Sequence, residues 1–269
     1  MHSSTVRNLL VRGMLAGLVA GLLAFAVAYA IGEPPVDDSI AVEEAQSARE
    51  APHAGHGGAA SEDAAEEEEV VSRSVQSTAG LGTGVLVYGV ALGGIASLAF
   101  SFALGRIGRF SPRATAALTA AAAFTTVYLV PFLKYPATPP AVGNPDTIGK
   151  RTTLFFLMIL LSVLLGIGAV IVGRRLAPRL GNWNATLVAG AGFIAAVAIA
   201  FVFLPANDDA VKAGFPAAVL WEFRVASLAI QAVLWTVFGI VFGTLAQRLL
   251  APRTADAPAE AERPTPAAA

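Results

Sequence analysis

Cysteine is absent from the 269 residues, and histidine occurs only three times. Without cysteine, the chain can form no disulfide, thiolate metal site or thiol redox centre. Charged residues are also scarce, at 14%, whereas hydrophobic residues make up 55% and the mean hydropathy is +0.65. This composition excludes a soluble globular protein and predicts an integral membrane protein.

Ionisable residues are missing from the middle of every long apolar run, which argues against a proton relay of intramembrane carboxylates. The polarity at mid-depth comes from neutral side chains, namely Thr125, Thr126, Tyr128, Ser162 and Gln231. The segment 143–150 looks like a phosphate-binding loop, but five residues separate its glycines and an arginine replaces the required Ser or Thr. We therefore expect no bound nucleotide and no nucleic-acid partner. No paired catalytic groups suggest an enzyme.

The apolar runs predict an all-α fold, a polytopic membrane bundle of about six transmembrane helices. The expected spans are 9–31, 78–104, 114–133, 153–173, 185–204 and 224–245. They divide the chain into residues 1–31, with the first span; an acidic segment, 32–77; five further spans, 78–250; and a Pro/Ala-rich tail, 251–269, with the composition of a disordered segment. An alternative for the first span is a cleaved signal peptide, because Ala28-Tyr29-Ala30 resembles a cleavage site.

Lysine and arginine alternate in density between successive connections, which predicts the orientation. The N-terminus, the tail and two alternate loops hold eleven arginines, whereas the other side holds seven cations and sixteen of the nineteen acids. By the positive-inside rule both termini are cytoplasmic, and the acidic segment faces outward. Arginines 24 residues apart, Arg151 and Arg175 and then Arg224 and Arg248, also suggest a possible repeat of helical hairpins.

Glycines four residues apart occur on several spans, and we interpret these faces as helix-packing surfaces. They are Gly13/Gly17/Gly21, Gly89/Gly93 and Gly239/Gly243.

The acidic segment 32–77 holds twelve carboxylates, and its first part, after Pro34 and Pro35, reads as a short helix. Asp37 and Glu44 share one face of that helix. His53 and His56 form an H-x-x-H pair in the following Gly/Ala tract, which has a disordered composition. Imidazole and carboxylate suit Co, Ni or Zn, so these four side chains are candidate metal-capture residues. A solvated acidic face with incidental histidines remains the alternative.

Five prolines between residues 130 and 152 interrupt the apolar sequence at the centre of the chain. Because proline lacks an N–H and disfavours helix in the residue before it, this stretch is expected to be a rigid, non-helical outer loop. Cations flanking it are awkward for a cation path, so the loop is expected to shape or gate an entrance. The gate candidates are Pro131, Lys134, Pro136, Asp146 and Arg151.

Several strings together resemble the CbtA family of predicted cobalt-transporter subunits of prokaryotic inner membranes. They are LLVRGMLAGLVAGLLAF, GEPPVDDSIAVEEA, VYGVALGGI, YLVPFLKYPATPPAVGNPDTIGKRT and FRVASLAIQAVLW, and the resemblance covers nearly the whole chain except residues 50–70 and the tail. It implies a permease component for Co(II), under cobalamin control and paired with a small single-span, histidine-bearing subunit. Members commonly carry a histidine-dense insertion, of which His53 and His56 are all that remain here.

These observations together predict a cobalt-uptake subunit of the bacterial inner membrane, surrounded by lipid, with no resident cofactor and with Co(II) as the transported ion. Two alternatives belong to other classes: a non-transporting membrane scaffold that organises a partner, and an enzyme acting on a lipid or quinone.

Overall fold

The computed structural model describes residues 3–50, 72–140, 142–143, 147–207, 211 and 214–251. In these ranges the chain is helical and contains no strand. The elements are α1 (Ser3–Val27), η1 (Ala28–Gly32), α2 (Glu33–Glu50), α3 (Arg73–Val75), η2 (Gln76–Gly80), α4 (Leu81–Ala103), α5 (Pro112–Ala123), η3 (Phe124–Leu129), α6 (Val130–Lys134), α7 (Ile148–Phe203) and α8 (Ala217–Leu250), where η denotes a π-helical turn.

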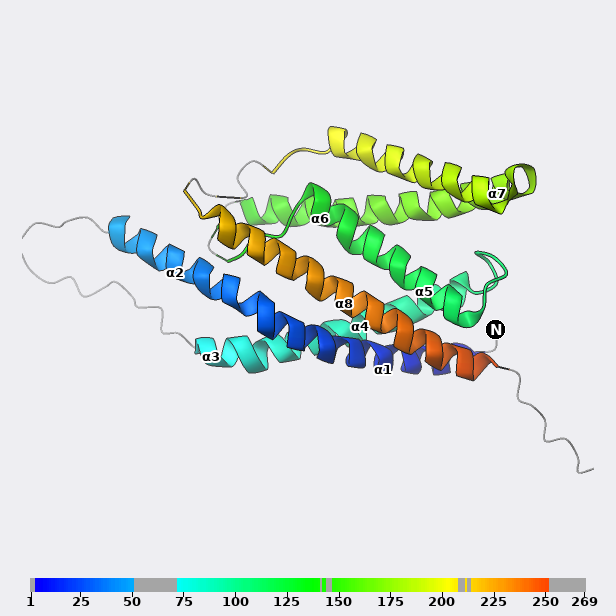
Figure 1. Cartoon of the computed structure of the whole chain (residues 1–269), viewed down its shortest axis with the longest axis horizontal. Coiled ribbons are helices and arrows are strands. Elements are labelled where there is room, and N and C mark those ends of the chain that lie inside the picture. The colour runs from blue at the N-terminus through cyan, green and yellow to red at the C-terminus, as the bar shows by residue number, and fades with distance from the viewer. Residues whose placement is uncertain are drawn as a thin grey trace, which may run out of the picture.

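Five helical runs in the described chain are long and apolar enough to cross a membrane, which confirms the all-α polytopic bundle. They are Ser3–Ala48, Arg73–Ala103, Pro112–Lys134, Ile148–Phe203 and Ala217–Leu250. The fourth run, α7, contains both segments expected to be the fourth and fifth spans. Its backbone leaves the helical region at Gly181, where φ is 75° and ψ is 160°, a conformation that glycine adopts without strain. Figure 1 shows the two limbs of α7 folded back against each other.

The helices α1, α4, α5 and α8 enclose the main core, whereas α7 lies to one side and packs on η3 and α6 (Figure 1). Large aromatic side chains of α8 fill this core, with Phe238 and Phe242 stacked on each other and Phe100 edge-on to Phe242. A smaller cluster joins α6 to both limbs of α7. The start of α5, the turn of α7 and the end of α8 lie at one end of the bundle, near the N-terminus (Figure 1).

Glycines bring α1 and α4 into backbone contact, as their spacing predicts. A Cβ added to Gly17 would overlap the carbonyl oxygen of Gly89, and one added to Gly93 would overlap the carbonyl oxygen of Gly13. Between α5 and α8, Gly239 packs on Ala120. The first apolar run is therefore an integral part of the core, which supports a permanent span over a removable leader.

Pro34 and Pro35 do not interrupt the helix that begins at Ser3. Immediately before them, the Glu33 N–H donates to the Ala28 carbonyl five residues back, in the π-helical turn η1. The wider turn shifts the hydrogen-bond register, so the missing proline donors do not end the helix. The acidic helix that the sequence predicts is present as α2, but it is continuous with the first span and is not a separate short helix.

The non-helical part of the proline-rich region is shorter than predicted. The expectation was residues 130–152, but α6 continues helically to Lys134 and α7 begins at Ile148. Pro131 lies within the helix because the preceding π-helical turn, η3, lets the Val130 N–H donate to Thr125. The Thr126 carbonyl, which Pro131 has no N–H to reach, accepts a hydrogen bond from Ser162 Oγ of α7. A side chain from a neighbouring helix thus replaces the donor that proline lacks.

Candidate functional site

One end of the bundle holds α2 and the loop between α6 and α7, and we call it the outer end because the distribution of charges predicts that it faces outward. Arg73, at the start of α3, binds two of the α2 carboxylates. Its Nη2 lies 2.5 Å from Glu33 Oε2 and 2.8 Å from Asp37 Oδ1, and its Nε lies 3.0 Å from the same Asp37 oxygen. Burial alone would lower the pKa of Arg73, but the hydrogen bonds and the charges of both carboxylates raise it. These contacts fasten α2 to α3 across the start of the second span.

The four candidate capture residues are distributed unevenly. Asp37 is paired with Arg73, although its side chain remains 61% exposed. Glu44 lies two turns further out on α2 and is exposed. His53 and His56 lie outside the described residues, as does Asp146. In the described part of the chain, no three His, Asp or Glu side chains gather closely enough to hold a metal ion.

The proline-rich loop is held by hydrogen bonds to α2, to α8 and to the segment that follows α7. Ser39 of α2 is fully buried, and its Oγ donates to the Pro140 carbonyl at 2.5 Å. From α8, Arg224 Nε donates to the Ala137 carbonyl at 3.3 Å. Tyr135 donates through its hydroxyl to the Pro205 carbonyl at 2.9 Å, and burial raises the pKa of this phenol, so it stays protonated as the donor. The loop is therefore a fixed cap that joins α2, α7 and α8.

The remaining gate candidates have structural contacts in this cap. Lys134 Nζ donates to the Phe201 carbonyl at 2.7 Å, near the C-terminal end of α7, where carbonyls lack helical partners and the helix dipole attracts a cation. The Arg151 guanidinium lies directly against Gly143, where a Cβ would overlap it. Pro131 is buried and Pro136 half-buried. The cations that are awkward for an ion path thus bind and pack against the backbone of the cap.

Beneath the cap, four neutral polar side chains meet within the outer half of the bundle, and we call them the outer polar cluster. Tyr88 of α4, whose side chain is 44% exposed, pairs with Gln231 of α8, and Tyr128 of η3 pairs with Ser227 of α8. The two tyrosines lie close enough for an electrostatic interaction. Ser227 and Gln231 are four residues apart, so they lie on one face of α8. The cluster therefore draws on three helices that are distant in sequence.

Two buried polar atoms on this face of α8 have no hydrogen-bond partner among the described residues. They are Gln231 Oε1 and, one turn further in, Trp235 Nε1, whose side chain is 5% exposed. An unsatisfied buried polar atom costs about 1–3 kcal/mol, so its retention points to a ligand or water at this position. Gln231 offers a carbonyl-type oxygen, and the tyrosines and Ser227 offer hydroxyls. Neutral oxygens of this kind suit the passage of a hydrated cation and bind it too weakly to hold it.

The sequence identified Tyr128 and Gln231 as polar residues at mid-depth but missed Tyr88 and Ser227. A signal was available, because both are hydroxyl-bearing residues within or beside apolar runs at a similar depth. What the sequence alone could not provide was the pairing of α4 with η3 and α8. Thr126 and Ser162, also named from the sequence, form the separate η3–α7 contact described above.

Comparison with known proteins gives one family. A family model described as "Probable cobalt transporter subunit (CbtA)" matches residues 6–247. No curated protein and no solved structure matches the chain significantly.

Proposed function

Since the chain belongs to the CbtA family of probable cobalt transporter subunits, as a multi-pass protein of the inner membrane, we propose that hydrated Co(II) crosses it through the outer polar cluster. Family membership favours transport over both the scaffold and the lipid or quinone enzyme. The term subunit implies a partner protein. We also propose that this partner is a small single-span subunit that bears histidines.

The first step is accumulation of cations at the acidic segment. Glu33 and Asp37 are engaged with Arg73, which leaves the outward acids of α2, including Glu44, and the tract with His53 and His56 as the capture elements. Electrostatic attraction raises the local cation concentration and the rate of encounter, but it does not select cobalt. Selection is then expected to depend on histidines, whether on this chain or on the partner.

The second step is passage into the bundle beside the cap. Because the cations of the cap bind backbone carbonyls, the cap acts as a rigid wall of the entrance. Below it, Gln231 Oε1 is an acceptor without a protein partner, available to a water molecule of the hydrated ion. This unpartnered oxygen is the observation that carries the proposal. A hydrogen bond to a charged species contributes about 1.5–3 kcal/mol, enough to change a rate tenfold or more.

The test is cobalt uptake into liposomes or cells carrying the full chain, alone and with its partner. Gln231→Leu removes an acceptor that has no protein partner together with the contact to Tyr88, so we expect stability to change by less than about 1 kcal/mol and uptake to fall about tenfold or more. Ser101→Ala is the control, because among the described residues its hydroxyl bonds the Ser97 carbonyl within its own helix, α4. The path is refuted if Gln231→Leu inserts correctly and transports as well as the control. No cobalt accumulation by the unaltered protein in either condition would refute the transport role itself.

A further inference from the structure

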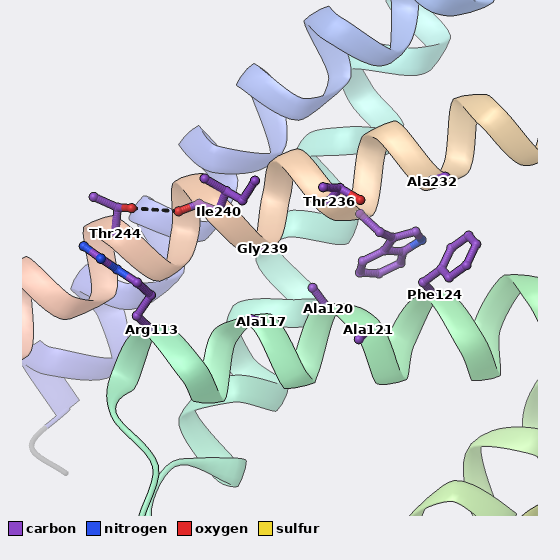
Figure 2. Close-up of a pocket in the computed structure, with 11 residues that line it drawn as sticks. Arg113, Ala117, Ala120, Ala121, Phe124, Ala232, Thr236, Gly239, Ile240 and Thr244 are labelled. Carbon is purple, nitrogen blue, oxygen red and sulfur yellow. Dashed lines mark hydrogen bonds between the residues drawn. The ribbon is translucent and has the colours of Figure 1, made fainter.

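A second feature begins at the arginine-rich end of the bundle and extends along α8 to Trp235 and to Ala232, the residue that follows Gln231 of the proposed path. A groove of about 580 Å³ runs between α5 and α8 (Figure 2). Small residues of both helices form its floor: Ala117, Ala120, Ala121, Ala232 and Gly239. A volume of this size is in the range of small-molecule sites. Since several of these residues are exposed, the groove opens to the surrounding hydrocarbon.

Arg113 stands at one end of the groove, and Figure 2 shows its side chain extending from α5 toward Thr244 of α8. Arg113 is in the first turn of α5, so it lies where the span meets the headgroup layer. Among the described residues, the guanidinium of Arg113 makes no ion pair. No acid occurs between residues 104 and 120. An exposed cation therefore borders an apolar channel, with no anion paired to it in the described part of the chain.

From this arrangement we propose that the α5–α8 groove binds an anionic phospholipid, with an acyl chain along the small-residue floor and the phosphate group at Arg113. One lipid molecule satisfies both features, because its chain fills the apolar groove and its charge meets the arginine. A transmembrane helix of another protein would fill the groove but would leave Arg113 without an anion unless that helix carried a carboxylate at this depth. The charge complementarity thus favours the lipid.

Trp235 provides a reporter inside the groove. It lines the groove and is 5% exposed, whereas the two other tryptophans, Trp183 and Trp221, are 75% and 68% exposed. The double variant Trp183→Phe/Trp221→Phe leaves Trp235 as the only tryptophan. Bromine atoms on an acyl chain quench indole fluorescence on contact, so quenching measures occupancy of the groove by the labelled lipid.

The experiment reconstitutes the full-length double variant in phosphatidylcholine bilayers containing a small, equal fraction of brominated phosphatidylglycerol or brominated phosphatidylcholine. We expect brominated phosphatidylglycerol to quench Trp235 more strongly, with about fivefold higher occupancy of the groove. Arg113→Gln should abolish this preference. Arg248→Gln, which removes an exposed arginine at the same end that does not line the groove, should keep it.

A groove-filling substitution, Ala117→Leu, tests the position of the acyl chain and should reduce quenching by both lipids. The proposal is overturned by equal quenching from the two lipids, by a preference that survives Arg113→Gln, or by quenching that Ala117→Leu leaves unchanged. It is also overturned if a photoreactive side chain at Thr236, activated in cell membranes, captures a protein segment and no lipid.

Discussion

The close contact between α1 and α4 can be tested by comparing two glycine-to-alanine substitutions on α4. At Gly93, a Cβ would overlap the Gly13 carbonyl oxygen and lie 2.9 Å from the Gly17 Cα. At Gly84, also on α4, a Cβ would meet no atom within 4 Å. The two substitutions add the same methyl group to the same helix, so they differ only in what that methyl group meets.

The two substitutions are expected to change the free energy of unfolding in opposite directions. Carbon atoms pack best at about 3.5–4.0 Å, so Gly93→Ala must push α1 away from α4 by a substantial fraction of an ångström. The obstructing atoms are backbone and cannot rotate aside, which places the overpacking penalty near the upper end of about 1–3 kcal/mol. Replacing glycine by alanine in a helix itself gains about 0.5–1 kcal/mol. We therefore expect Gly93→Ala to destabilise by about 2 kcal/mol and Gly84→Ala to stabilise by up to about 1 kcal/mol.

The assay is thermal unfolding of the purified full-length chain in a mild detergent, followed by the fraction that remains monodisperse. A difference of about 3 kcal/mol corresponds to roughly 6–12 °C between the two variants. If both variants unfold at the same temperature, or if Gly84→Ala is the less stable, α1 and α4 do not meet through these glycines.

Three further predictions concern the bonds and residues described above. Ser162→Ala should destabilise by about 1–3 kcal/mol, because it leaves the Thr126 carbonyl without a donor, and Pro131→Ala in the same chain should recover part of the loss by restoring an N–H, as measured by thermal unfolding. Arg73→Gln should change stability by less than about 1 kcal/mol, since the ion pair is partly exposed, but should increase protease cleavage of the α2 region as its two bonded carboxylates are released. Replacing His53 and His56 together by alanine should reduce uptake at low cobalt and not at high cobalt, and unchanged uptake at both concentrations would reject capture by these histidines.

The helical architecture could be predicted because it follows from local properties of the sequence. Long apolar runs specify membrane helices, and glycines four residues apart specify where backbones can approach. The partner of each glycine face was not predictable, since Gly17 and Gly89 are joined by tertiary packing and not by any sequence pattern.

The prolines show more clearly which features could not be predicted from the sequence. Pro34 and Pro131 both carry the usual signal for a helix end, yet both lie within helices. In each case a π-helical turn precedes the proline, and at Pro131 the hydroxyl of Ser162 supplies the missing donor from a different helix. The outer polar cluster depends on tertiary structure in the same way, because Tyr88 and Gln231 are recognised as a site only when α4 and α8 are placed side by side.

Because α1 and α2 form one continuous helix, the distance of each α2 acid from the entrance is fixed. At 1.5 Å per residue, Glu44 lies about 8 Å further out than Ser39, the α2 residue that is bonded to the cap. The Debye length at physiological ionic strength is also about 8 Å, so Glu44 acts about one screening length away from the entrance. A rigid helix cannot bend it closer. Its influence on cation arrival should therefore be weakened in physiological salt and should grow as the ionic strength falls to about 0.01 M, where the Debye length reaches about 30 Å.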